Sequence, residues 1–318
     1  MSIQPDEKTL AQYESARGGC AIFDISGRGR LTLAGKDRLK FLQGLITNDV
    51  MKPSAGQGLY ALMLNRKGRI LTDMRLFLSE DETALDLEPS VADVTAERMN
   101  DFKLSYKVDI KKDEGRAVFH LCGAEAAGCV SRITGADAGA MNPFDHRDCP
   151  QIDARAARTD RLGVTGFDID TPGANAGEVR KLFEKGGAAF AGADVFEAVR
   201  IEAVIPVYGK DMDESTIAPE AGLENAVSFE KGCYVGQEIV ARTHWRGRVN
   251  RHLAGFVFEG DPPPGGSEFF SGGSAAGRVT SSGFSPRLGT VAMGYIRREY
   301  AAAGTEILTS GGQRGKVV

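Results

Sequence analysis

Hydrophobic and polar positions along the chain follow two different patterns. Up to about residue 203 short strands alternate with helices, whereas beyond residue 242 short β segments are separated by Gly, Pro and Ser. The first pattern is typical of an α+β fold in which helices cover one face of a sheet. The second is typical of a small β-barrel or sandwich. We therefore predict an α+β region at 1–245, in two subdomains, and a C-terminal β-barrel domain at 246–318.

Within the first region the periodicity predicts a series of short elements. A capping-box spacing, Asp194 followed by Glu197, is expected to open the last helix. The stretch 135–160 has no clear pattern and is expected to be a loop. The predicted strands are 20–34 (two, around a Gly-rich turn), 56–64, 69–78, 83–87, 105–110, 117–121 and 162–169, and the predicted helices are 37–45, 90–101, 125–133, 176–186 and one from 195.

Asp73 interrupts the apolar pattern of the second strand of the 56–78 hairpin. A carboxylate inside such a strand is costly if it is buried without a partner. Asp73 therefore either faces water, which the pattern alone favours, or serves a site.

Composition and charge indicate an ordinary globular protein. The 318 residues are 42% hydrophobic and 26% charged, and the net charge of −4 gives no general reason to bind nucleic acid. No stretch approaches the roughly 18 apolar residues of a membrane span, and the polar, acidic start resembles no secretory signal. We expect a cytoplasmic protein without a membrane segment.

The five cysteines are scattered and form no C-x-x-C pair. This usage fits a reducing compartment better than a disulfide framework. His146 and Cys149 are spaced i, i+3, but two ligands without two more are a weak signal, and we expect no metal site.

The stretch 229–242 has the highest density of residues that can react with or bind a ligand. Cys233 lies between Gly232 and Gly236, beside Lys231. The following run, 237–242, can form a short helix or a strand. A helix would place Cys233 at its N-terminal end, where the dipole and the lysine favour a thiolate. Free cysteines are more often small buried residues, so the pattern leaves a functional and a structural thiol equally open.

A basic patch follows between Arg242 and Arg251, with His244, Trp245 and His252 interleaved. It suits an anion such as a carboxylate tail or a nucleic-acid backbone, with an aromatic ring for stacking. A solvated surface at a domain junction would look the same.

The octet Lys231-Gly-Cys-Tyr-Val-Gly-Gln-Glu238 resembles the K-G-C-Y-x-G-Q-E signature of the YgfZ family of folate-binding proteins. That family is connected with iron–sulfur cluster assembly and repair and with tRNA modification. Other segments resemble the wider superfamily, which includes the aminomethyltransferase, or T-protein, of the glycine cleavage system. These segments are 41–50, 60–68, 200–202, 208–211, 219–223 and 294–297.

The resemblance implies a T-protein-like fold of antiparallel sheets with helices around a central channel for tetrahydrofolate. Glu220 falls where the superfamily uses a carboxylate to read the pterin, and Tyr60 falls among the folate-binding positions. Asp73 falls at the aminomethyltransferase's acidic pair, in which Thr72 replaces the other Asp. Arg242 is assigned to the glutamate tail by charge.

The residues and the resemblance together leave two functions open. The first is a tetrahydrofolate-binding protein of YgfZ type that supports iron–sulfur client proteins, and thereby tRNA modification, with Cys233 as an essential thiol and Lys231, Gly232, Tyr234, Gly236, Gln237 and Glu238 as its signature. The alternative is an aminomethyltransferase acting on tetrahydrofolate, with Asp73 placing a proton. A tRNA contact through Arg242–Arg251 is a weaker third hypothesis.

Overall fold

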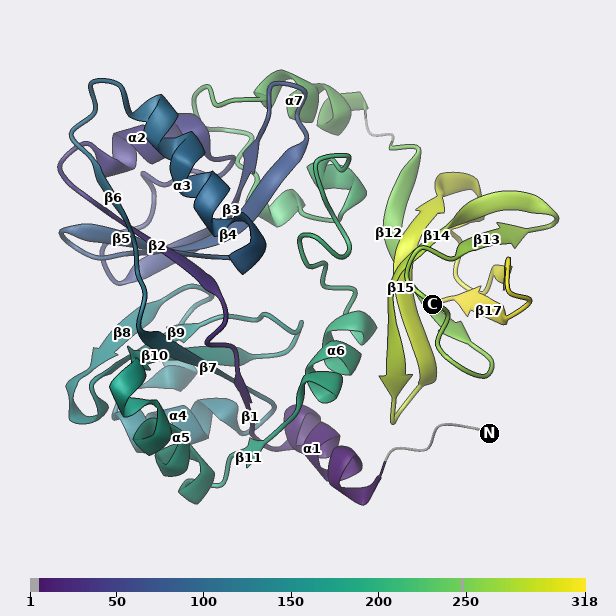
Figure 1. Ribbon diagram of the computed structural model, residues 1–318, viewed down its shortest axis with the longest axis horizontal. Coiled ribbons are helices and arrows are strands. Elements are labelled where there is room, and N and C mark those ends of the chain that lie inside the picture. The colour runs from purple at the N-terminus through teal and green to yellow at the C-terminus, as the bar shows by residue number, and fades with distance from the viewer. Residues whose placement is uncertain (1–5, 247–248) are drawn as a thin grey trace.

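The computed structural model describes residues 6–246 and 249–318. Two stacked sheets with their helices form the body, at the left of Figure 1, and a β-barrel lies beside them at the right. Helix α6 (Ala193–Glu202) runs between the body and the barrel (Figure 1). The predicted α+β architecture with antiparallel sheets and a C-terminal barrel is confirmed.

The lower sheet has, among the described residues, six strands in the order β11-β1-β7-β10-β9-β8. All its pairs are antiparallel except β1 with β11. Apolar residues of the sheet pack against α4 and α5, while α1 and α6 contribute to a second cluster with β1. Its elements are β1 (Ala21–Asp24), β7 (Arg116–Cys122), β8 (His146–Cys149), β9 (Ala154–Arg158), β10 (Gly166–Pro172), β11 (Ala189–Phe190), α1 (Glu7–Gly18), α4 (Ala126–Thr134) and α5 (Ala176–Lys185).

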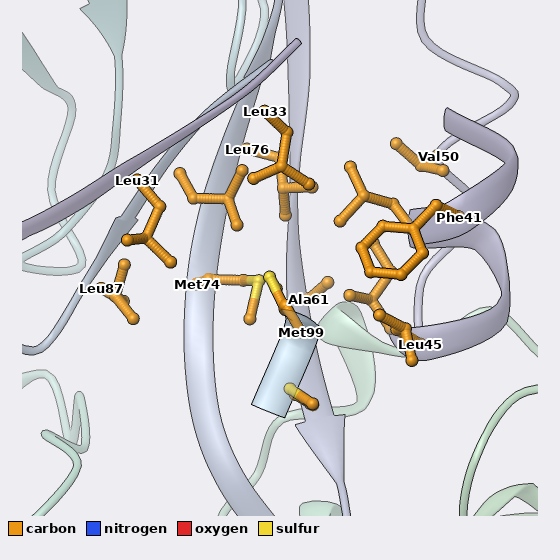
Figure 2. Close-up of a cluster of buried hydrophobic side chains, with 14 of the residues drawn as sticks. Leu31, Leu33, Phe41, Leu45, Val50, Ala61, Met74, Leu76, Leu87 and Met99 are labelled. Carbon is orange, nitrogen blue, oxygen red and sulfur yellow. The ribbon is translucent and has the colours of Figure 1, made fainter. Parts of the chain in front are cut away.

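The upper sheet has five strands within the described ranges, in the order β3-β4-β5-β2-β6. Its apolar face packs against α2 and α3 in the cluster shown in Figure 2, where Met74 of β4 lies close to Met99 of α3. The elements are β2 (Gly29–Ala34), β3 (Gln57–Leu64), β4 (Ile70–Leu78), β5 (Glu82–Leu87), β6 (Asp109–Lys112), α2 (Arg38–Leu45) and α3 (Pro89–Lys103).

The barrel is closed by six strands of the described chain in the order β12-β15-β14-β13-β16-β17. Fully buried Arg200 of α6 anchors it: its guanidinium donates to Asp211 (2.9 Å) and to the Ser281 hydroxyl on β14 (2.8 Å). Asp211 belongs to the acidic loop 209–223, so this loop helps to hold the barrel against α6. The strands are β12 (Arg251–Phe258), β13 (Glu268–Ser271), β14 (Ser274–Ser285), β15 (Gly289–Arg297), β16 (Glu306–Thr309) and β17 (Arg314–Val317).

Several local predictions are wrong. The segment 135–160 contains β8 and β9, whose few apolar residues are buried by pairing within the sheet. The strand expected at 105–110 is β6 (Asp109–Lys112), and the strand expected at 162–169 is β10 (Gly166–Pro172). The capping box does not form, because α6 begins at Ala193 after Gly192 and Glu197 instead binds Arg200.

Candidate functional site

A cavity of about 340 Å³ lies where the two sheets meet α6. Its wall is built from the β1–β2 connection, β4, the start of α3 and the segment 205–210. The wall residues with polar side chains are Asp24, Arg28, Asp73, Arg75, Glu88, Arg161, Glu197, Arg200 and Lys210. We call this the central cavity. Its position between elements far apart in sequence explains why no single motif reveals it.

A β-bulge in β4 directs Asp73 into the central cavity. Leu64 pairs with Ile70 whereas Met63 pairs with Thr72, so Leu71 is the extra residue. The bulge changes the alternation, and Asp73 comes to the same face as Ile70 and Tyr60. Asp73 is only 5% exposed, so the water-facing interpretation of this residue is wrong.

One carboxylate oxygen of Asp73 has no hydrogen-bond partner among the described residues. Its Oδ2 accepts a hydrogen bond from the Tyr60 hydroxyl (2.8 Å), while its Oδ1 is buried with no hydrogen-bond partner in the described structure. Burial, and next the charge of Asp73, raise the pKa of Tyr60 well above its usual value, so the phenol stays a donor. Neighbouring Thr72 is buried and donates to the Asp73 carbonyl (3.0 Å).

Arg28 supplies the complementary group. Its Nε donates to Asp86 (2.8 Å) and its Nη1 pairs with Glu88, which leaves Nη2 buried and unpaired among the described residues. The wall of the central cavity thus contains a carboxylate oxygen and a guanidinium nitrogen that are both buried and unpaired among the described residues. Such groups are costly to bury unless a ligand satisfies both.

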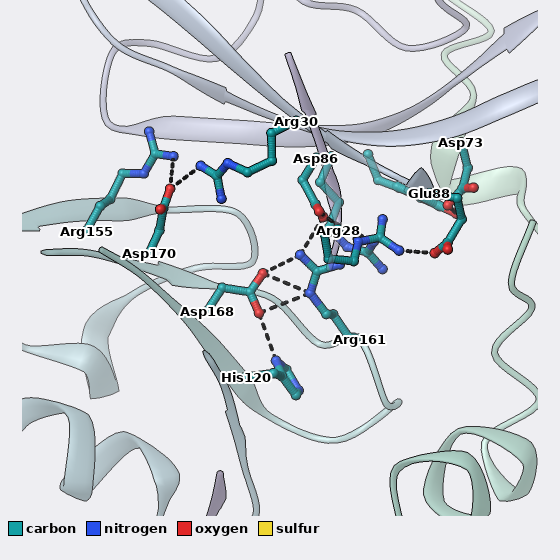
Figure 3. Close-up of polar contacts among 12 residues, drawn as sticks. Arg28, Arg30, Asp73, Asp86, Glu88, His120, Arg155, Arg161, Asp168 and Asp170 are labelled. Atoms are coloured by element: carbon teal, nitrogen blue, oxygen red, sulfur yellow. Dashed lines mark hydrogen bonds and ion pairs between the residues drawn. The ribbon is translucent and has the colours of Figure 1, made fainter. Parts of the chain in front are cut away.

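An ion network supports this wall from below (Figure 3). Arg161, 6% exposed, bridges Asp86 of the upper sheet and Asp168 of the lower one. Burial alone would raise the pKa of both carboxyls. The charges of Arg161, Arg28 and Arg75 at Asp86, and Arg161 together with the His120 hydrogen bond at Asp168, outweigh it and hold each pKa well below its usual range. His120 donates through Nδ1 to Asp168 (2.9 Å), and burial lowers its pKa, so it is neutral.

Cys233 lies elsewhere, in a groove of about 710 Å³ beside the β3–β4 turn. The thiol is exposed, and Gln237 and Glu238 line the same groove with Arg66, Arg98 and Phe102. We call this the Cys233 groove. Among the described residues, its wall and that of the central cavity have no member in common. The structure therefore separates Cys233 from Asp73.

Helix α7 (Gln237–Arg246) resolves the ambiguous run after the cysteine as a helix. Cys233 precedes Gln237, its first residue, by four positions and is not in the first turn. Lys231 does not serve the thiol either. Its ammonium donates to the carbonyls of Gln43 (2.7 Å), Ile46 (2.7 Å) and Asn48 (3.0 Å) at the C-terminus of α2, which uses all three of its hydrogens.

Two glycines fix the signature loop against the β3–β4 turn. Gly236 has φ +85°, and a Cβ there would lie 2.6 Å from the Asn65 carbonyl oxygen. Gly68, in the turn, faces Ile239 at a distance that also excludes a Cβ. Gly232, in contrast, has open space around it. The fold thus requires glycine at 236 but not at 232.

Glu220 and Arg242 line neither of these two cavities in the described structure. The Glu220 carboxylate accepts from Arg251 (3.2 Å), whose guanidinium stacks on Tyr295 (4.9 Å). Arg242 is exposed on α7. Arg248, part of the predicted basic patch, lies outside the described residues, and the pairing of Arg251 with Glu220 reduces the patch's free charge.

Sequence reasoning missed Arg28, Arg75 and Arg161. Arg75 stands between buried Met74 and Leu76 and approaches Asp86 at 3.8 Å. A charged residue inside an apolar strand is the sequence feature that marks Asp73, and the same feature marks Arg75. For Arg28 and Arg161, both in connecting segments, no comparable signal exists.

Neither a metal cluster nor a membrane helix is found in the parts of the chain that the structure describes. No group of three or more His, Cys, Asp and Glu side chains there is placed to hold a metal ion. No helix there has the length and apolar character to cross a membrane.

The fold and the cavity define a class: a two-sheet α+β body with a charged central cavity beside α6, joined to a barrel that has six strands in the described chain. Residues 4–231 match the GCVT N-terminal domain, and residues 251–316 match the glycine cleavage T-protein C-terminal barrel domain. The chain therefore belongs to the glycine cleavage T-protein family.

Known relatives support the assignment to the T-protein family. An aminomethyltransferase of a Thermoanaerobacter species is 30% identical, covering 95% of this chain and 84% of its own length, and that of Bacillus subtilis is 28% identical over 93% and 84%. The crystal structure of the glycine cleavage system aminomethyltransferase T of Bartonella henselae superposes with a TM-score of 0.87 at 25% identity, covering 98% of this chain and 88% of that one. These matches establish the T-protein superfamily and do not bear on the narrower YgfZ resemblance.

Proposed function

We propose that the protein binds tetrahydrofolate in the central cavity. The observation that carries the proposal is that two residues in the cavity wall each hold a buried polar atom with no partner among the described residues: Oδ1 of Asp73 and Nη2 of Arg28. A pterin ring presents N–H donors beside a carbonyl acceptor, and so matches one free acceptor and one free donor. Membership of the T-protein family supports this ligand.

Calorimetric titration with tetrahydrofolate tests the placement. Asp73→Asn keeps the shape of the side chain but removes its charge, and we expect an affinity loss of about tenfold to a hundredfold, the worth of a charge-assisted hydrogen bond. Glu220→Gln is the matched comparison, because the resemblance assigns that residue to the pterin. A loss in Glu220→Gln with normal binding in Asp73→Asn would contradict the proposed site.

Aminomethyl transfer to the bound folate is the first candidate for the reaction at this site. Relatives named aminomethyltransferase, aligned over nearly the whole chain, favour it. In this reaction the Asp73 carboxylate would hold a proton at the ligand nitrogen, and Tyr60 would fix its second oxygen.

A direct assay decides on this activity. Incubation with an aminomethyl-lipoyl carrier protein and tetrahydrofolate should release ammonia and yield methylenetetrahydrofolate at an enzymic rate. Asp73→Asn should reduce that rate about 10²- to 10⁴-fold. No product from a preparation that binds tetrahydrofolate would exclude the transfer and keep the binding.

A second candidate is support of iron–sulfur client proteins in the manner of the YgfZ family. The specific observation in its favour is the exposed thiol of Cys233 in a groove of its own, where a partner can reach it. The other four cysteines are buried.

Complementation tests this role. In cells lacking the protein, Cys233→Ala should fail to restore iron–sulfur-dependent tRNA modification, although the variant binds tetrahydrofolate normally. Arg66→Gln, a change in the same groove that keeps the thiol, is the control for a general surface effect. Full restoration by Cys233→Ala would exclude a chemical role for the thiol.

A further inference from the structure

A third cavity, of about 370 Å³, lies between the two sheets at the end of the ion network away from Asp73 (Figure 3). Strands β2 and β5 of the upper sheet form one side, and β7, β9 and β10 of the lower sheet form the other. In the described residues it shares no wall member with the central cavity. Its volume falls in the usual range of small-molecule sites.

The floor of this cavity carries excess positive charge. Three arginines converge on Asp170: Arg116 donates to it at 2.7 Å, Arg155 donates at 2.8 Å, and Arg30 pairs with it. Asp113, whose carboxylate lies 3.7 Å from Arg30 Nε, adds a second negative charge, so three guanidinium groups share two carboxylates. The floor therefore attracts an anionic group.

Arg30 provides a donor for that group. Its side chain is only 9% exposed, and its Nε is buried without a hydrogen-bond partner among the described residues. The Asp113 carboxylate is 3.7 Å from Nε, too far for a hydrogen bond. A buried donor left in this state calls for an acceptor from outside the chain.

The rim of the cavity has the opposite charge. Glu82, Asp148 and Asp153 are exposed there, and Asp113 is partly exposed. A simple anion would be repelled at the rim, and a simple cation would meet the arginines of the floor. A ligand that carries both charges fits both parts.

We propose that this cavity binds a free α-amino acid in its zwitterionic form. The carboxylate lies toward Arg30 and Arg116, and the ammonium group lies toward Asp148 and Glu82. This site is separate from the proposed folate site and does not depend on it.

The first experiment uses the full-length protein without folate. A thermal-shift screen of the twenty amino acids selects the strongest binder, which is then titrated by calorimetry beside its amide and its N-acetyl derivative. We expect the amide, which lacks the carboxylate, and the N-acetyl form, which lacks the ammonium, to bind at least about tenfold more weakly. No shift with any amino acid, or equal binding by either derivative, would overturn the proposal.

Two variants then locate the site. Asp148→Asn changes an exposed rim residue and should weaken binding about tenfold, whereas Asp81→Asn, the same change at an exposed position outside the wall, should not. Arg30→Lys keeps the charge but removes the Nε donor and should also weaken binding. If Arg30→Lys fails to fold, the Asp148 and Asp81 pair still decides: equal affinity in the two would overturn the proposal.

Discussion

The central cavity and the Cys233 groove differ in how the chain builds them. The central cavity collects Arg28, Asp73, Arg161 and Arg200 from four distant segments and buries all of them except Arg28, which is partly buried. The groove presents one local motif, with an exposed thiol on a loop held by backbone contacts. The structure of the central cavity depends on the balance of buried charges, whereas that of the Cys233 groove depends on backbone conformation. Substitutions of each kind should therefore affect the two regions differently.

Replacing Arg161, the cation shared by Asp86 and Asp168, should have the largest effect on the stability of the two-sheet body. Arg161→Met leaves Asp86 and Asp168 buried without their shared partner, and we expect a loss of about 3–5 kcal/mol in the free energy of unfolding. Urea unfolding measures this. Exposed Arg242→Met is the control and should stay within about 0.5 kcal/mol.

The same network predicts acid sensitivity. Because the folded-state pKa values of Asp86 and Asp168 lie below the unfolded value near 4, their contribution to stability is complete above that pH and is lost as pH falls below it. The wild type should therefore lose stability below about pH 4 more steeply than Arg161→Met. Parallel curves would contradict this assignment.

Tyr60→Phe is expected to weaken folate binding without disturbing the fold of the groove. It removes the hydrogen bond to Asp73 Oδ2 and leaves both carboxylate oxygens unpaired, a cost of about 1–3 kcal/mol. Tetrahydrofolate affinity and urea unfolding should be measured together, with Cys233 reactivity toward a thiol reagent as an internal control. A change in thiol reactivity alone would link the two regions.

Two glycines of the signature octet allow the stability and the function of the Cys233 groove to be tested separately. Gly236→Ala forces a Cβ into the Asn65 carbonyl at a positive φ and should cost about 1–3 kcal/mol of stability. Gly232→Ala meets no atom and should leave stability within about 0.5 kcal/mol. A functional loss in Gly232→Ala at unchanged stability would show that a partner approaches the backbone beside Cys233.

The smallest expected effect is a pH dependence at Lys231. Burial lowers the pKa of this lysine to about 8, although Asp49 partly opposes the shift. An unfolded lysine titrates near 10.4, so between about pH 8 and pH 10 the unfolded chain binds more protons. Wild-type stability should therefore rise with pH in this window relative to Lys231→Met, as followed by urea unfolding. A constant difference would place the pKa of Lys231 near its usual value.

The α+β region and the barrel were predictable because their cores follow local periodicities. The 56–78 hairpin, with apolar residues on both strands and a Gly-containing turn, is confirmed as β3 and β4. The strands β8 and β9 were missed because they are short and carry mainly Ala and Arg rather than large apolar residues, and their burial comes from neighbouring strands rather than from their own side chains.

The sequence by itself determined the family resemblance, the Cys233 motif and the unusual position of Asp73, since each lies within a few consecutive residues. The tertiary structure alone decided that Asp73 faces a cavity with Arg28, that Lys231 binds the end of α2, and that Cys233 opens onto a different groove. A single bulged residue in β4 changes the face of a strand, and buried ion pairs join segments more than fifty residues apart, from Arg28 to Asp86. Such contacts depend on how the sheets pack, which local patterns of hydrophobicity do not specify.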